Sequence, residues 1–219
     1  MRRLRSPLVP ALGVVVGLAG CSAATDAAGP HDSGPVAVRY VTRVVSFVQG
    51  EGGGKNADRL PVVVEGPPVG AGSGSGSSDT LSLGNGGEIV VAFDGDVGDG
   101  PGPDLVVYEN PFFINGDPTN VFSELGEVSV SDDGATWATF PCAATALPFE
   151  GCSGWRPVYA TPARPPDPAH LDDGGGEAFD LATLGLHHAR FVRIRDLNTK
   201  RPACCGVAGF DLDAVAVLH

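Results

Sequence analysis

Residues 127 to 140 read EVSVSDDGATWATF, two short runs on either side of Asp132-Asp133-Gly134. In the first run apolar and polar residues alternate, which is typical of a strand with one buried face. An Asp-Gly pair between two such runs is a strong signal for a tight hairpin. This stretch therefore predicts an antiparallel pair of strands.

The rest of the chain repeats this kind of signal. A second hairpin is predicted where LSLG and EIVVAF flank Asn85-Gly86-Gly87. Residues 104–110, DLVVYEN, are apolar on both faces and predict a central strand. Further strands are predicted at residues 36–48, 60–66, 189–197 and 209–218. A single short helix is predicted after Asp180, its N-cap. Short strands joined by Gly and Pro turns indicate an all-β fold, an antiparallel β-sandwich.

Several of these segments carry a family resemblance. EVSVSDDGATWATF followed by ARFVRIRDL resembles the galactose-binding-like jelly rolls, including the discoidin or coagulation-factor C-type modules. With GPGPDLVVYENPF, GGGEAFDLATLGL and GFDLDAVAVL, residues 36–219 resemble bacterial exported "cell surface proteins". The resemblance implies a jelly-roll β-sandwich, a fold that hosts sugar binders, lipid binders and adhesion modules.

The chain also departs from the discoidin-type pattern. Those modules have a disulfide that joins the ends of the domain, whereas here no cysteine lies between Ser22 and Pro141. Their aromatic lipid-binding loops are not identifiable either. Insertion of loops into a membrane is therefore not carried over from the family.

The start of the chain has the pattern of an export signal. A basic segment, MRRLRS, precedes a short apolar segment that ends in Leu18-Ala19-Gly20-Cys21. This end resembles the bacterial lipobox, in which the cysteine becomes the first residue and carries a diacylglycerol. We expect a lipoprotein signal peptide at 1–20, a flexible tether at 21–35 and the β-sandwich domain at 36–219. The expected location is the cell envelope, lipid-anchored at the outer membrane or cell surface.

The charge balance restricts the partners. The formal net charge is −12, and it becomes about −15 without Arg2, Arg3 and Arg5 of the leader. Such a surface repels nucleic acid and anionic lipid, so no nucleic-acid partner is expected. It favours cations and neutral ligands such as sugars.

Four cysteines remain after Cys21. They are Cys142, Cys152, Cys204 and Cys205. An even number in an exported chain indicates disulfides. A local Cys142–Cys152 bridge is favoured, which leaves a vicinal Cys204–Cys205 bridge, and crosswise pairing is the alternative. A zinc site is disfavoured because no CxxC or HxxxH spacing occurs.

Acidic residues suggest a metal site. The aspartates of DGDVGDGPGPD (94–104) do not have EF-hand spacing. Galactose-binding-like domains often hold a structural Ca²⁺ near the sheet rim, so the resemblance implies ligands from separated segments. The candidate ligands are Asp104, Glu109, Asn110, Asp180, Asp211 and Asp213. Two alternatives stay open, namely that these aspartates cap their own turns or that they pair with Arg193 and Arg195.

Aromatic residues in loops suggest a ligand surface. Phe112 and Phe113 follow Glu109-Asn110-Pro111, and Trp155 follows Cys152-Ser153-Gly154. These three are the candidate ligand-binding residues. No G-x-S-x-G motif occurs, and we expect no enzymatic activity. The predicted function is a non-catalytic, calcium-stabilised surface module that binds a glycan or is adhesive. The alternative is an assembly lipoprotein that binds an envelope protein.

Overall fold

The computed structural model describes residues 37–199 and 208–219, and this part of the chain is mostly β. The strands are β1 (Arg39–Val48), β2 (Leu81–Ser82), β3 (Glu88–Gly98), β4 (Leu105–Tyr108), β5 (Phe112–Phe113), β6 (Val121–Phe122), β7 (Gly126–Ser131), β8 (Ala138–Thr139), β9 (Glu177–Phe179), β10 (His188–Asp196), β11 (Asp211–Leu212) and β12 (Ala214–Val217). The helical turns are η1 (Ala57–Arg59), η2 (Val62–Val64), η3 (Ile114–Gly116), α1 (Leu171–Gly174) and η4 (Leu181–Leu184). No helix in the described residues is long and apolar enough to cross a bilayer.

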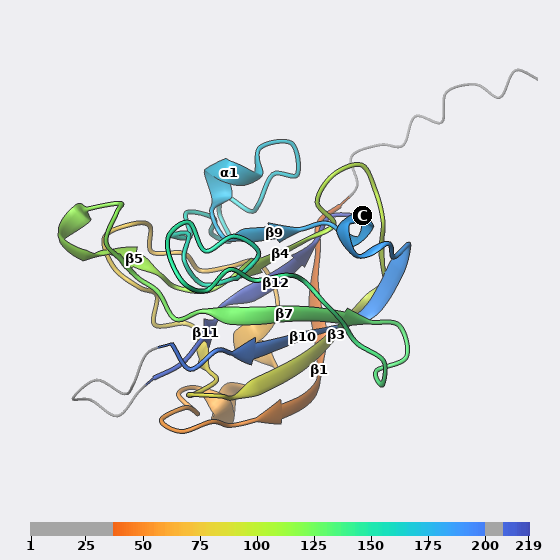
Figure 1. Cartoon of the computed structure of the whole chain (residues 1–219), viewed down its shortest axis with the longest axis horizontal. Helices are drawn as coiled ribbons and strands as arrows, with labels where there is room; N and C mark the ends of the chain where they lie inside the picture. Colours follow the sequence, from red (N-terminus) through yellow and green to blue (C-terminus); the bar gives the residue numbers. More distant parts are fainter. Residues whose placement is uncertain (1–36, 200–207) are drawn as a thin grey trace, which may run out of the picture. The chain divides into compact units, whose positions relative to one another are not determined.

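Eight strands form one curled antiparallel sheet in the order β8-β7-β10-β3-β1-β12-β4-β9 (Figure 1). Strand β1 joins its two halves. Arg39 and Tyr40 pair with β12, and the residues from Val41 to Val48 pair with β3. The register shifts twice along β1, and such bulges bend and twist a strand. The bend lets one strand serve both halves of the sheet.

The two halves face each other across one hydrophobic core. Inward side chains of β3, β7 and β10 meet those of β4, β9 and β12 in a single cluster. The position of strand β4 between two apolar clusters explains why its sequence is apolar throughout. Leu105 and Val107 enter this core, whereas Val106 and Tyr108 face a second cluster with Val158 and other residues. Successive residues of a strand point to opposite faces, and here both faces are covered.

Several sequence predictions are confirmed. Strands β7 and β8 pair across the Asp132-Asp133-Gly134 turn, with Val130 opposite Ala138. The alternation at 189–197 predicted a strand, and strand β10 is present and pairs with both β3 and β7. Asp180 caps the turn that follows it by accepting a hydrogen bond from the N–H of Ala182 (2.8 Å). That turn is the 3-10 helix η4.

Two local predictions are wrong. The β-branched run at 60–66 forms the 3-10 turn η2 and no strand, because Pro61 precedes it and Val63 and Val64 anchor it in the core. The Asn85 turn does not join two paired strands, because β2 pairs with β11 instead of β3. Leu81 and Leu83 are buried, so core packing directs this segment away from the local hairpin.

The predicted Cys142–Cys152 disulfide is present. Cys204, Cys205, Cys21, the leader and the tether lie outside the described residues.

Replacing both Cys142 and Cys152 with alanine is expected to lower the free energy of unfolding by about 3 kcal/mol, because the unfolded chain regains the entropy of the short loop. Urea unfolding of the double variant measures this. A midpoint equal to that of the unaltered protein would contradict it.

Candidate functional site

Three carboxylates from separate segments meet inside the domain. Glu109 follows β4, Glu124 follows β6, and Asp211 begins β11. The residues are 2 %, 8 % and 8 % exposed, respectively. One carboxylate oxygen from each lies within 4.8 Å of the others. We call these three residues the buried acidic cluster.

Backbone groups satisfy part of the cluster. The N–H of Asp211 donates to Glu109 Oε1 (3.2 Å), and the N–H of Gly209 donates to Glu124 Oε1 (2.8 Å). Asn110 Nδ2 donates to Asp211 Oδ2 (3.4 Å) and to the carbonyl of Ser77 (2.8 Å). Glu109 Oε2 and Asp211 Oδ1 are buried without a hydrogen-bond partner among the described residues. A buried polar atom without a partner is costly, so each needs an explanation.

Burial and mutual repulsion also make negative charge unfavourable in the cluster. Burial raises the pKa of Glu109 well above its usual range, and the neighbouring Asp211 and Glu124 raise this pKa further. Burial also raises the pKa of Asp211, against the lowering effects of the Ser82 hydroxyl, Lys55 and Asn110. The cluster therefore resists holding several negative charges by itself. An all-oxygen ligand set of carboxylates is the kind that hard cations prefer, so these residues could hold a metal ion.

The other predicted ligands lie elsewhere. Asp99, Asp104 and Asp180 form a second acidic group, in which backbone donors occupy both oxygens of Asp104 and one oxygen of Asp180. Asp104 Oδ1 accepts from the N–H of Gly100, and its Oδ2 accepts from the N–H of Leu181, both at 2.7 Å. Turn capping, one of the alternatives from the sequence, therefore describes Asp180, whereas Asp104 joins its own loop to the start of η4.

Asp213 occupies a third place. Strand β11 ends at Leu212 and β12 begins at Ala214, so Asp213 lies at a break and does not share a site with Asp211. Both of its oxygens accept from the N–H of Val69 (3.0 Å each). Burial raises the pKa of Asp213 to about 7. The arginine alternative is not seen, because Arg193 and Arg195 pair with Glu88.

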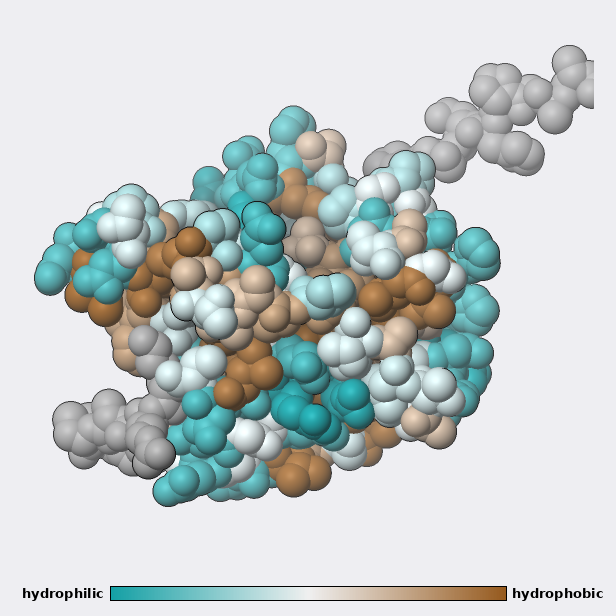
Figure 2. Space-filling view, viewed as in Figure 1, coloured by the Kyte–Doolittle hydropathy of each residue, from teal (hydrophilic) through white to brown (hydrophobic). Residues whose placement is uncertain are grey.

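Two of the three predicted ligand-binding residues line one hollow of about 240 Å³, which we call the aromatic groove. Its lining consists of Phe113, Pro118, Val121, Leu147, Trp155, Arg156, Pro157, Tyr159, Asp172 and Gly175. Hydrophobic side chains gather on the surface around β5, beside hydrophilic ones (Figure 2). Phe112 is not part of the lining and stacks on Phe122 instead, with ring centroids 5.1 Å apart.

The Trp155 wall of the groove is firmly held. The carboxylate of Glu177, on β9, accepts from the N–H groups of Gly154 (2.9 Å), Trp155 (3.0 Å) and Arg156 (2.7 Å). Trp155 Nε1 donates to the carbonyl of Cys152 (3.2 Å), next to the disulfide. Because the backbone and the indole are both fixed, the aromatic face is positioned before any ligand arrives.

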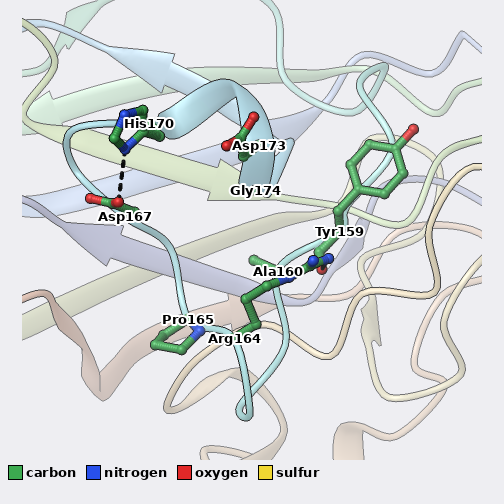
Figure 3. Close-up of a pocket in the computed structure, with 8 residues that line it drawn as sticks. All are labelled: Tyr159, Ala160, Arg164, Pro165, Asp167, His170, Asp173 and Gly174. Atoms are coloured by element: carbon green, nitrogen blue, oxygen red, sulfur yellow. Dashed lines mark hydrogen bonds and ion pairs between the residues drawn. The ribbon is translucent and has the colours of Figure 1, made fainter.

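Charged groups line the groove beside the aromatic residues. Arg156 Nη2 lies 2.6 Å from Asp172 Oδ1, and both residues belong to the lining. Tyr159 lines the groove and also a neighbouring hollow of about 420 Å³. There an Asp167–His170 pair (2.9 Å) lies across from Tyr159 (Figure 3). The hydrogen bond that the His170 ring donates to the Asp167 carboxylate raises the pKa of His170.

No protein-family model matches the chain, and no curated protein matches it either. The functional assignment therefore depends on the geometry of these sites.

Sequence reasoning missed Glu124, and it did not select Tyr159 for the ligand surface. Glu124 lies in FSELGEV, where its acidic side chain has no feature that distinguishes it from a solvated glutamate. It is buried because β6 leads the chain back beside β11. Tyr159 was a visible aromatic residue, but nothing local placed it beside Trp155. Both belong to their sites through tertiary contacts between distant segments.

Proposed function

We propose that this domain is a non-catalytic binding module and that the aromatic groove binds a glycan. The observation that carries the proposal is that Phe113, Trp155 and Tyr159 line one hollow together with the Arg156–Asp172 pair. Ligand sites combine apolar and aromatic walls with a few placed polar groups. Aromatic faces can pack on the C–H faces of a sugar, while Arg156 and Asp172 can bond its hydroxyls. The acidic net charge of −12 favours neutral ligands.

The proposal includes the cellular setting expected from the sequence. The fold is proposed to be a galactose-binding-like jelly roll, because a curled antiparallel sheet around one core is compatible with it. Cys21 is proposed to carry a diacylglycerol, so that the tether displays the domain at the cell surface. This setting is consistent with a disulfide in the described domain, because such bonds persist in oxidising compartments.

The glycan proposal predicts a specific loss of binding. On a glycan array, Trp155→Ala is expected to weaken binding at least tenfold, because the best positioned aromatic face of the groove is removed. The matched control is Trp137→Ala, since Trp137 lies under Arg193 (4.4 Å to the ring centroid) and does not line the groove. Equal binding by the two variants would remove the groove from the proposal.

We further propose that Ca²⁺ is the cation that the buried acidic cluster holds. The three carboxylates supply oxygen ligands from separate segments, and Ca²⁺ accepts such irregular sets more readily than Mg²⁺ does. The two buried oxygens without partners are the observation that supports a bound cation here.

Calcium is then expected to stabilise the fold. At a Ca²⁺ concentration one hundred times its Kd, the free energy of unfolding should rise by about 2.7 kcal/mol. Urea unfolding in Ca²⁺ and in chelator measures the difference. Asp180→Asn, in the second acidic group, is the control that should keep the full effect. If chelation leaves the unfolding curve of the unaltered protein unchanged, the calcium proposal is wrong.

A second candidate function is binding to another envelope protein. Val45, Val48 and Val62 are 46 %, 61 % and 66 % exposed, and large apolar residues on a surface can mark a protein interface. Absence of glycan binding together with a stoichiometric complex with an envelope protein would favour this function over the first.

A further inference from the structure

The hairpin formed by β5 and β6 has a simple relation to the buried acidic cluster. Phe112 pairs with Phe122 and Phe113 with Val121, so the hairpin spans residues 111–123. Glu109 lies just before it, and Glu124 lies just after it. The two ends of the hairpin therefore each bring one carboxylate to the cluster. Asp211 supplies the third carboxylate from the body of the domain.

The same hairpin forms one wall of the aromatic groove. Phe113, Pro118 and Val121 belong to the groove lining. The β5–β6 ladder is a separate two-stranded sheet outside the eight-stranded one. An isolated two-stranded hairpin is marginally stable in water. A backbone hydrogen bond from Phe113 N–H to the carbonyl of Ser73 (2.8 Å) ties it to the 66–79 loop. The position of this wall therefore depends on how the hairpin ends are held.

Glu124 also lies against the opposite wall. A Cβ atom built on Gly154 would come within 2.3 Å of the backbone oxygen of Glu124. Gly154 immediately precedes Trp155. A change in the position of Glu124 would therefore displace Gly154, and with it the backbone that orients Trp155.

Repulsion between the carboxylates of the cluster opposes this arrangement. Three carboxylates are held together in a buried place, where ionised groups of like sign repel. Glu109 Oε2, in a residue that is 2 % exposed, and Asp211 Oδ1, in one that is 8 % exposed, have no hydrogen-bond partner among the described residues. These orphan oxygens are independent of the clustering itself. Each of these two oxygens can therefore accept a further partner, and a cation is a partner that the three carboxylates could share.

We propose that a divalent cation bound by Glu109, Glu124 and Asp211 fastens both ends of the β5–β6 hairpin and thereby completes the aromatic groove. This inference rests on the proposed function, since it takes the groove as the ligand site. The cation then raises ligand affinity without touching the ligand. Because coupling between two sites is reciprocal, a groove ligand raises cation affinity by the same factor.

The test uses Ca²⁺ alone as the probe and needs no groove ligand. Hydrogen exchange of the whole protein is followed by mass spectrometry in Ca²⁺ and in chelator. We expect exchange in peptides covering residues 111–123 to slow at least tenfold in Ca²⁺, with little change in peptides covering β10. Emission of Trp155, recorded in a Trp137→Phe background, should change over the same Ca²⁺ range.

Variants identify the carboxylates. Glu124→Gln should abolish the calcium-dependent protection, whereas Asp180→Asn should retain it. Should Glu124→Gln fail to fold, Asp211→Asn takes its place, and the comparison of the unaltered protein in Ca²⁺ and chelator stands without any variant.

The outcomes separate this inference from the proposed function. If calorimetry shows calcium binding but hydrogen exchange at residues 111–123 is unchanged, the proposed coupling between the cation and the groove is wrong. Absence of calcium binding also overturns the coupling. Glycan binding through Trp155 is compatible with either result. Calcium-dependent protection of the hairpin supports the coupling, even when the glycan array shows no binding and the ligand class has to be revised.

Discussion

Replacing Glu177 with alanine is expected to lower the free energy of unfolding by about 4 kcal/mol at pH 5, because three backbone N–H groups lose their acceptor in a largely buried place. Glu177 is 6 % exposed and accepts from Gly154, Trp155 and Arg156. The loop that carries Trp155 has these contacts as its main polar anchor to β9. The variant should therefore also weaken any binding that uses the aromatic groove.

The effect of this substitution should depend on pH. Burial raises the pKa of Glu177 to about 7, against its three N–H donors and Arg156, which lower it. A carboxyl with a folded pKa above its usual value binds its proton more tightly when folded. The unaltered protein should therefore lose about 3 kcal/mol of stability at this residue as pH rises from about 4.5 to about 7. The alanine variant lacks this loss, so its deficit should shrink to about 1 kcal/mol at pH 8.

Urea unfolding at pH 5 and pH 8 measures both parts of this prediction. Glu127→Ala, at the half-buried position of β7, is the control and should change stability by less than about 0.5 kcal/mol at either pH. Unaltered stability of the Glu177 variant at pH 5 would show that Glu177 does not hold the loop as described, and a deficit that grows with pH would contradict the raised pKa.

Phe210→Ala is expected to lower the free energy of unfolding by about 4 kcal/mol, through lost burial and the cavity left behind. Phe210 is fully buried in the main core and directly precedes Asp211. A Cβ atom built on Gly126 would lie 2.7 Å from its ring, so the ring packs directly against the backbone there. The same ring approaches Gly154, which links the core to the Trp155 loop.

Two comparisons make the Phe210 prediction specific. Phe210→Leu keeps most of the volume and should cost less than about half as much as the alanine variant. Phe191→Ala, at a half-exposed position on β10, should cost about 1 kcal/mol. Chemical denaturation of the three variants ranks their free energies of unfolding. A Phe210→Ala variant no less stable than Phe191→Ala would contradict the packing around Phe210.

Local sequence was a good guide where neighbours along the chain decide the structure. The Asp132-Asp133-Gly134 turn predicted the β7–β8 pair, because Asp133 accepts hydrogen bonds from the N–H groups of Ala135 and Thr136 two and three residues later. Asp180 predicted a helical turn for a similar reason. The prediction failed at Asn85, because β2 pairs with a segment more than 120 residues later in the chain.

The candidate sites show the same division. Phe113 and Trp155 were predicted as exposed aromatic residues, and both line the groove. The six predicted metal ligands fall in three places, and the group with unpartnered oxygens includes Glu124, which was not predicted. Composition and spacing show which side chains can bind a cation or a sugar. They do not show which of them meet.

The sequence by itself determined the mostly β class, the β7–β8 hairpin and the apolar strand β4, because short-range periodicity and turn chemistry decide these features. It favoured the local Cys142–Cys152 bridge, which the structure contains. Only the tertiary structure decided that Glu109, Glu124 and Asp211 share one buried place. The reason is physical: burial and repulsion between carboxylates arise when segments about 15 to 100 residues apart are brought together by the closure of the sheet around its core.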